Sequence, residues 1–429
     1  MLSWTQVYAL LLPWIAALGV APHRATARAL CTRLTAVVLG QTLTPADLVR
    51  TVLSDLPTPA RSGVRRVART WVSPTLTAAW LTPILVRAAL ALSWATGATP
   101  LLALDSVRCG GWEIFTVGLV VHKRTLLVGW RVLPYPWPKK TFTPTVCTLL
   151  SQVAAAWPAG VPLPHLLADR GFPSGKRFRL LQWLRWGFTI RLCATDVVTL
   201  PGQAQTRVRA VLDSARVGHW DCWRDVQYAD GPRAQLVVGR GLAVLPWHQR
   251  DAGRARARAR RAQRRLHDLH SKHPRQRPDA SAQTDRWVVL FTSCPTWREA
   301  TDTYAQRWSI EGTYRDGQSG WDGRHGWNLE PLVAQQRLAR AVEGIVGLWA
   351  LALLVQTWVG DGLNAPAQLP AAPQRVVRSW TVSLRLSVWA RGRLAFLDQS
   401  GLLHDWLTAR LTAGARRLEQ GPPGQQQAA

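Results

Sequence analysis

Residues 304–318 read Y-A-Q-R-W-S-I-E-G-T-Y-R-D-G-Q, a segment with helical periodicity that carries an acid. On one continuous helix successive residues turn by about 100°, so Tyr304, Arg307, Glu311 and Gln318 fall within an arc of about 60°. A helix buried in a core seldom carries such a polar stripe. The stripe therefore predicts either a solvated face with ordinary charges or one side of a functional site.

Two other acids end short apolar runs bounded by proline. Asp105 ends L-L-A-L-D, and Asp169 ends L-P-H-L-L-A-D. Such runs predict buried strands that deliver a carboxylate at the edge of a sheet. Either Asp alone is explained better as the start of a turn after a strand. Because a buried Asp is costly unless it is paired or binds a metal, the two acids and Glu311 together indicate a shared site.

Asp105, Asp169 and Glu311, with the spacing Tyr304-x-x-Arg307-x-x-x-Glu311, resemble the DDE transposases of bacterial insertion sequences. The resemblance is to the IS-four group, which includes the Tn-five transposase and is marked by a Tyr-Arg-Glu-Lys signature. It extends from about residue 30 to about residue 360. It implies that the three acids are catalytic metal ligands and that Tyr304 and Arg307 contact DNA phosphates at the element end.

One position departs from that signature. Gln318 stands seven residues after Glu311, where the family has Lys, so one DNA-phosphate contact is in doubt. Arg315 lies eleven positions after Tyr304 and falls on the same predicted face, and we hypothesise that it supplies the missing charge. The departure also leaves open a catalytically inactive descendant that only binds DNA.

Three carboxylates without a Cys or His ligand set suit hard, oxygen-preferring ions, Mg²⁺ or Mn²⁺. Two such ions roughly 3.5–4 Å apart can activate a water or a 3′-hydroxyl and stabilise the leaving oxygen of a phosphoryl displacement. The resemblance thus implies a transposase that cuts and joins its element ends. A metal-dependent nuclease on the same fold would cut without joining.

The charge of the chain predicts a polyanionic partner. Its 429 residues include 53 Lys and Arg against 25 Asp and Glu, a net charge of +28, although a compositional drift toward Arg would give the same balance. Residues 250–277 hold eleven Lys or Arg and two Asp, a net charge of +9. This segment is interpreted as a DNA-phosphate contact or as a solvated linker. Its candidate DNA-binding residues are Arg256, Arg258, Arg260 and Arg261.

Other motifs limit the function further. Six scattered Cys without a C-x-x-C pair argue against a zinc module and a disulfide framework, so we expect a cytoplasmic protein, nucleoid-associated when bound to DNA. The apolar run at 341–360 contains Glu343 and Gln356 and predicts a core helix, with no membrane segment. His122, His165 and His325 accompany no nucleophile motif and are interpreted as structural. Five tryptophans could stack on an extruded base, but usually such residues fill the core: Trp183, Trp186, Trp308, Trp321 and Trp327.

The order of expected elements predicts an α/β fold with a ribonuclease-H-like core. Strands are expected at 101–108, 112–121 and 124–133, a helix at 145–156, a strand ending at Asp169, a helix at 174–186 and strands at 188–193 and 286–293. Short strands at 208–212, 220–228 and 234–238 predict a β insertion, and a helix is expected to run from Thr296 through Gln318. This order would bring the first and fourth strands side by side, and so Asp105 near Asp169.

The expected domains follow from these elements. Residues 1–95 are expected to form a helical DNA-binding domain, with a helix starting at Thr44-Pro45 and a basic one that carries Arg61, Arg65, Arg66 and Arg69. From these residues alone, a solvated basic helix without a particular function is an equal alternative. Residues 96–199 and 286–365 form the two parts of the core, interrupted by the β insertion at 200–285, and 366–429 form a partly helical C-terminal region with a disordered end. The expected partners are the terminal inverted repeats, target DNA and, in the DNA complex, a second copy of the chain.

Overall fold

The computed structural model describes residues 3–53, 60–93, 99–122, 124–241, 287–318, 329–363, 388–397 and 403–420. The chain is mixed α/β and forms two compact units. Unit 1 combines Met1–Pro164 with Trp308–Ala429, and unit 2 is His165–Arg307. This division falls at other positions than the expected domain boundaries, which remain a prediction.

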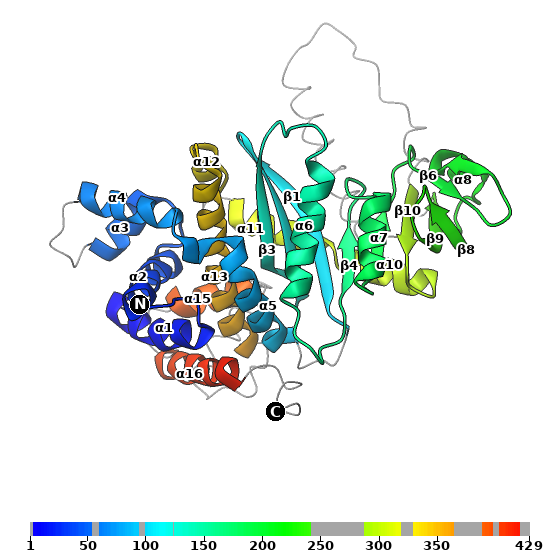
Figure 1. The fold of residues 1–429 in the computed structure, drawn as a ribbon. Helices are drawn as coiled ribbons and strands as arrows, with labels where there is room; N and C mark the ends of the chain where they lie inside the picture. The colour runs from blue at the N-terminus through cyan, green and yellow to red at the C-terminus, as the bar shows by residue number, and fades with distance from the viewer. Residues whose placement is uncertain are drawn as a thin grey trace, which may run out of the picture. The chain divides into compact units, whose positions relative to one another are not determined.

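In unit 1, helices α5, α6, α11 and α13 pack on a small sheet, and the other helices pack mainly on one another (Figure 1). Its N-terminal part is helical as predicted, and the helix expected at Thr44-Pro45 does begin at Pro45. The helices described in unit 1 are α1 (Trp4–Leu18), α2 (Arg24–Gly40), α3 (Pro45–Leu53), α4 (Ala60–Trp71), the short 3₁₀ helix η1 (Pro74–Leu76), α5 (Ala78–Ser93), α6 (Phe142–Ala155), α11 (Trp308–Gln318), α12 (Leu329–Ala334), α13 (Ala339–Gly362), α15 (Val388–Leu397) and α16 (His404–Gln420).

The sheet of unit 1 is antiparallel, in the order β3-β2-β1. Its strands are β1 (Leu101–Cys109), β2 (Trp112–Val121) and β3 (Arg124–Pro134), which confirms the three predicted runs. A Cβ added at Gly129 would press on Val153 of α6, whereas Thr125 bonds to Thr313 of α11. A β-bulge opposite Val117 and Gly118 shifts the register of β3, so that Thr125 and Gly129 face opposite sides of the sheet. Helix α6 therefore covers one face and α11 the other.

Helix α13 is the central helix of unit 1 and packs against β3, α5, α4 and α15. Two glycines let its neighbours approach closely. A Cβ at Gly344 would overlap the carbonyl of Trp71, and a Cβ at Gly392 of α15 would overlap that of Gln356. In the described part of the chain, α13 is the one helix long and apolar enough to cross a membrane, and 94% of its most apolar window is buried within the fold. The predicted core helix at 341–360 is therefore confirmed.

Unit 2 begins with a parallel pair of strands and continues as an antiparallel sheet in the order β4-β5-β10-β9-β8-β6-β7. Phe178 of α7 is fully buried against Phe188 and Phe291, so an aromatic cluster holds α7 on the sheet. The elements of unit 2 are β4 (His165–Ala168), α7 (Gly175–Trp183), β5 (Gly187–Arg191), β6 (Val197–Thr199), β7 (Gln205–Arg207), α8 (Val208–Ser214), β8 (Trp220–Tyr228), β9 (Arg233–Arg240), β10 (Trp287–Thr292) and α10 (Trp297–Ala305).

The continuous helix expected from Thr296 through Gln318 is wrong. Thr296 does cap a helix, since its Oγ1 accepts the amide of Glu299 at 3.2 Å, but α10 ends at Ala305 and α11 begins at Trp308. The last turn of α10 tightens to three-residue hydrogen bonds, as helix ends commonly do. Tyr304 and Glu311 therefore lie on different helices, and the single face predicted for the stripe does not exist.

Two further strand predictions need correction. Residues 208–212 form helix α8, because Val208, Val211 and Leu212 are buried at helical spacing. Strand β1 continues four residues beyond Asp105, which pairs with Thr116 in mid-strand and does not end the strand. The other two strands of the expected insertion are confirmed as β8 and β9, and the sequence missed β6 and β7.

Candidate functional site

Asp169 directly follows β4 in unit 2, as the sequence predicted. The residues before it, Leu166 to Ala168, are buried, and β4 pairs in parallel with β5. The carbonyl of Asp169 accepts the amide of Phe172 at 3.0 Å and so starts a turn. The Asp169 side chain stays 31% exposed. A carboxylate thus stands at the C-terminal end of a buried strand with one side open to solvent.

Tyr304 and Arg307 both lie beside this carboxylate. The Tyr304 hydroxyl donates a hydrogen bond to Asp169 Oδ1 at 3.2 Å, and the tyrosine is only 2% exposed. Arg307 is 3% exposed, and its guanidinium carbon lies 5.7 Å from the centre of the Tyr304 ring. The tyrosine and arginine of the Tyr-x-x-Arg motif therefore meet the acid of β4 within unit 2.

Sequence reasoning missed a fourth member of this group. Arg191 ends β5, the parallel neighbour of β4, and its Nη1 lies 3.9 Å from Asp169 Oδ1. Parallel neighbours end at the same edge of a sheet, so the run F-T-I-R ending at Arg191 was the signal available. We call Asp169, Arg191, Tyr304 and Arg307 the Asp169 cluster.

The cluster stabilises the ionised form of its acid. Burial alone would raise the pKa of Asp169, but the Arg307 guanidinium, the Arg170 amide, the Arg191 guanidinium and the Tyr304 hydroxyl together lower it below the ordinary value. Burial raises the pKa of Tyr304, and the nearby Asp169 charge raises it further. The phenol therefore remains a neutral donor to an anionic carboxylate.

In unit 1, Asp105 lies on the sheet face that α11 covers. Asp105 and Thr116 are register partners, so their side chains point to the same face of the sheet. The Thr116 hydroxyl forms a hydrogen bond with the phenol of Tyr314, a buried residue of α11. Burial and then the charge of Asp105 raise the pKa of Tyr314 well above its ordinary value.

Glu311 also lies close to Tyr314, because both residues belong to α11. It is half-buried and lies three residues before Tyr314, which makes the two side chains neighbours on the helix surface. Thr313 Oγ1 accepts the Thr125 amide and donates to the Thr125 carbonyl, both at 3.1 Å, and so fixes α11 on β3. Asp105 and Glu311 are therefore both neighbours of Tyr314 in unit 1.

Neither unit by itself contains all three carboxylates of the expected metal site. Among the residues that the structure describes, no three His, Cys, Asp or Glu side chains form a ready group of metal ligands. Asp105 and Glu311 belong to unit 1 and Asp169 to unit 2, so their expected adjacency remains a prediction. Mg²⁺ is commonly held by one or two carboxylates with waters and substrate phosphates, and oxygen-only donors such as these fit it.

The remaining predicted DNA-binding residues fall outside the described side chains. Arg315 and Gln318 lie on the last turns of α11, but their side chains are not among those described. Arg256, Arg258, Arg260 and Arg261 lie outside the described residues, as do Trp321 and Trp327. Their predicted roles therefore remain predictions.

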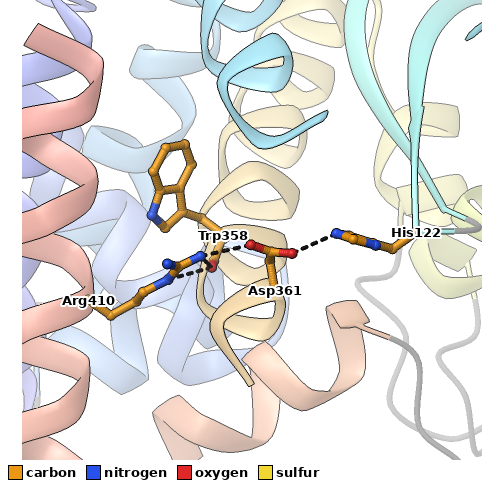
Figure 2. Close-up of polar contacts among 4 residues, drawn as sticks. All are labelled: His122, Trp358, Asp361 and Arg410. Atoms are coloured by element: carbon orange, nitrogen blue, oxygen red, sulfur yellow. Dashed lines mark hydrogen bonds and ion pairs between the residues drawn. The ribbon is translucent and has the colours of Figure 1, made fainter. Parts of the chain in front are cut away.

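A second polar group in unit 1 connects three distant segments (Figure 2). His122 Nε2 lies 2.6 Å from Asp361 Oδ1, and Arg410 Nη2 lies 2.8 Å from Asp361 Oδ2. The same arginine donates to the carbonyl of Trp358 at 3.3 Å. These contacts join the β2–β3 turn, the end of α13 and α16, so His122 has a structural partner here.

Comparisons with known proteins add no relative to this picture. No protein-family model matches the chain, and no curated protein is similar to it.

Proposed function

We propose that this protein is a DNA transposase that cuts and joins the ends of an insertion element by metal-dependent phosphoryl transfer. The observation that carries the proposal is the Asp169 cluster, in which the Tyr304 hydroxyl and the Arg307 guanidinium accompany a strand-end carboxylate whose pKa is lowered. Asp169, Tyr304 and Arg307 belong to the motif on which the resemblance to DDE transposases rests.

Each residue of the cluster has a chemical task in this proposal. Asp169 supplies anionic oxygen, and Tyr304 holds one of its two oxygens so that the carboxylate keeps one orientation. Arg307 and Arg191 add positive charge, to which a DNA phosphate is attracted. A divalent ion bound by Asp105, Asp169 and Glu311 would activate the attacking oxygen and stabilise the leaving one.

The proposal extends to fold, partners and location. The core would be ribonuclease-H-like, interrupted by a β insertion, with a helical DNA-binding domain before it. The partners would be the terminal inverted repeats and target DNA, bound by a homodimer with two Mg²⁺ or Mn²⁺ ions per site, in the cytoplasm. The net charge of +28 supports a polyanionic partner.

The test is cleavage of a labelled DNA fragment that carries the ends flanking the gene, with Mg²⁺ or Mn²⁺. Wild type is compared with Asp169→Asn and with a matched control, Asp196→Asn, which alters another half-buried Asp of unit 2 bonded to a tyrosine. We expect nicking at the repeat boundary by wild type and the control, and a loss of at least about 100-fold in Asp169→Asn. Equal cleavage by all three proteins would refute the assignment.

One observation favours a second candidate, a catalytically inactive DNA-binding protein. Two guanidinium groups already act on the Asp169 carboxylate, and Gln318 replaces the signature Lys. Such a protein would bind the flanking ends but cleave nothing under any metal. A nuclease on the same fold would cleave the ends but fail to join them to a target, so the cleavage assay and a strand-transfer assay together separate all three candidates.

A further inference from the structure

Helix α7 in unit 2 presents an aromatic side chain and cations on one exposed stripe. Lys176, Arg179 and Trp183 lie at positions i, i+3 and i+7, within about 60° of one another around the helix. All three side chains are exposed, and Trp183 is 76% exposed, the largest value among the large apolar side chains described. We call these three residues the α7 stripe.

The stripe is not needed to hold α7 in the fold. The opposite side of the helix buries Phe178 and Leu181, and the Phe178 ring packs 4.9 Å from that of Phe291. Trp183 is the last residue of α7, and its ring lies mostly in solvent and packs little against this core. A single exposed apolar side chain is ordinary on a protein surface, so the inference rests on the indole together with the cations that share its stripe.

The charges around the stripe favour an anionic partner. Lys176 is exposed, and Arg185 is exposed just beyond the end of the helix. One carboxylate stands among them, Asp230, which is 77% exposed and lies 3.0 Å from Arg179 Nη1. The same nitrogen of Arg179 also donates to the Asp230 carbonyl at 2.8 Å, but an ion pair this exposed contributes little stability. The surface therefore combines cations with a stacking platform.

We propose that the α7 stripe binds single-stranded nucleic acid, with Trp183 stacked on an unpaired base and Lys176 and Arg179 on the adjoining phosphates. Aromatic platforms flanked by cations are how single strands are held without base-specific readout. A base within a duplex is already stacked and does not offer its face to Trp183. The inference relies on the proposed function only for the source of the strand, which would be DNA unpaired at a cut element end.

The test measures binding of a fluorescent thymidine oligonucleotide and of a duplex by the full chain, at several salt concentrations. We expect Trp183→Ala to weaken single-strand binding by roughly 5- to 150-fold, because one base loses its stacking partner. Duplex binding should weaken by less than about twofold. Trp183→Phe retains a stacking ring and should retain most of the affinity. Lys176→Gln should reduce the salt slope of single-strand binding by about 0.7, as for one lost phosphate contact.

Matched controls separate the stripe from general effects. Arg209 is exposed and pairs with Asp213 at 3.3 Å, much as Arg179 pairs with Asp230, so Arg209→Gln should leave binding unchanged while Arg179→Gln weakens it. Val217→Ala removes another exposed apolar side chain of unit 2 and should also have no effect. Unfolding midpoints of the variants should match wild type.

Several outcomes would overturn the inference. Unchanged single-strand binding by Trp183→Ala, with cleavage of the flanking duplex ends intact, would reject the stripe and leave the proposed function standing. Loss of self-association in Trp183→Ala, without loss of oligonucleotide binding, would assign the stripe to a second copy of the chain. A wild-type protein that binds neither form of DNA would reject both proposals.

Discussion

Unit 2 contains two aspartate–tyrosine pairs that look alike and differ in electrostatics. Tyr304 donates to Asp169 at 3.2 Å, and Tyr228 donates to Asp196 at 3.0 Å. Both tyrosines are buried, and burial raises the pKa of each. Yet the pKa of Asp169 is lowered whereas that of Asp196 is raised.

The difference comes from the charges near each carboxylate. Burial raises the pKa of Asp196, and the groups that oppose it, the Cys193 amide and the Tyr228 hydroxyl, are neutral. At Asp169 an amide and a tyrosine hydroxyl act in the same way, but the guanidinium groups of Arg307 and Arg191 act in addition, and together these groups outweigh burial. A tyrosine partner therefore does not mark a functional acid by itself. The added cations create an ionised carboxylate in a positive environment, which is the electrostatic setting that a phosphate-handling site needs.

Removal of Arg307 should have the largest effect on the difference between the two aspartate–tyrosine pairs. Arg307→Gln takes a buried charge away from a partly exposed carboxylate, so we expect a loss of about 3 kcal/mol in the free energy of unfolding and a rise in the pKa of Asp169. Urea unfolding at pH 7 measures the first. Arg233→Gln is the control, because Arg233 forms an exposed pair with Asp225 and should cost at most about 1 kcal/mol. Equal losses in both variants would contradict the buried role of Arg307.

Removal of each tyrosine hydroxyl tests whether the pairs are structurally equivalent. Tyr304→Phe and Tyr228→Phe should each lower the free energy of unfolding by about 1.5 kcal/mol, since each removes a hydrogen bond to a carboxylate. Only Tyr304→Phe should also weaken binding to the flanking DNA ends. A similar loss of binding in Tyr228→Phe would mean that the effect is one of folding.

The pH dependence of stability should have opposite signs for the two acids. The lowered pKa of Asp169 gives a stabilisation that is present above the unfolded pKa of about 3.9 and is lost as the pH falls through the folded value. The raised pKa of Asp196 gives one that is present below about 3.9 and is lost as the pH rises through the folded value. From pH 3 to 7, wild type should gain stability relative to Asp169→Asn and lose it relative to Asp196→Asn. The measurement is the urea midpoint of each protein from pH 3 to 7. If wild type changed in the same direction relative to both variants, the opposite pKa shifts of Asp169 and Asp196 would be refuted.

The smallest effect should come from Arg191. Its Nη1 lies 3.9 Å from Asp169 Oδ1, and the two side chains are 23% and 31% exposed, so the ion pair is long and partly screened. Arg191→Gln should cost about 0.2–1 kcal/mol and lose its effect at high salt. A loss as large as that of Arg307→Gln would show that Arg191, and not Arg307, is the main countercharge.

The sequence correctly predicted strands and helices that depend on the local pattern of apolar residues. Strand β2 matches the expected run at 112–121, and Asp169 follows β4 as expected, because apolar β-rich runs and their turns are legible residue by residue. The helix at 341–360 was legible for the same reason. Even α8 obeys this rule, since Val208, Val211 and Leu212 carry the helical period that was misread as a strand.

The candidate site could be predicted only in part from the sequence, because tertiary packing decides where α10 ends and which residues lie beside the acids. Nothing in the periodicity of residues 304–318 shows that the helix stops at Ala305, and the boundary between the two units falls directly after Arg307. Arg191 and Tyr314 entered through strand pairing and helix packing, which join residues far apart in the chain. The motif therefore gave the acids and the Tyr-x-x-Arg pair, but not their electrostatic partners.

Site-specific titration of Asp169 and Asp196 measures the electrostatic difference between the two pairs. Carbon-13 NMR of selectively labelled carboxyl groups would follow Asp169 and Asp196 in the same folded protein, with and without Mg²⁺. For Asp169 we expect a pKa below the ordinary value that Mg²⁺ lowers further, and for Asp196 a pKa above the ordinary value that Mg²⁺ leaves unchanged. Equal pKa values, or a response to Mg²⁺ at Asp196 alone, would contradict this expectation.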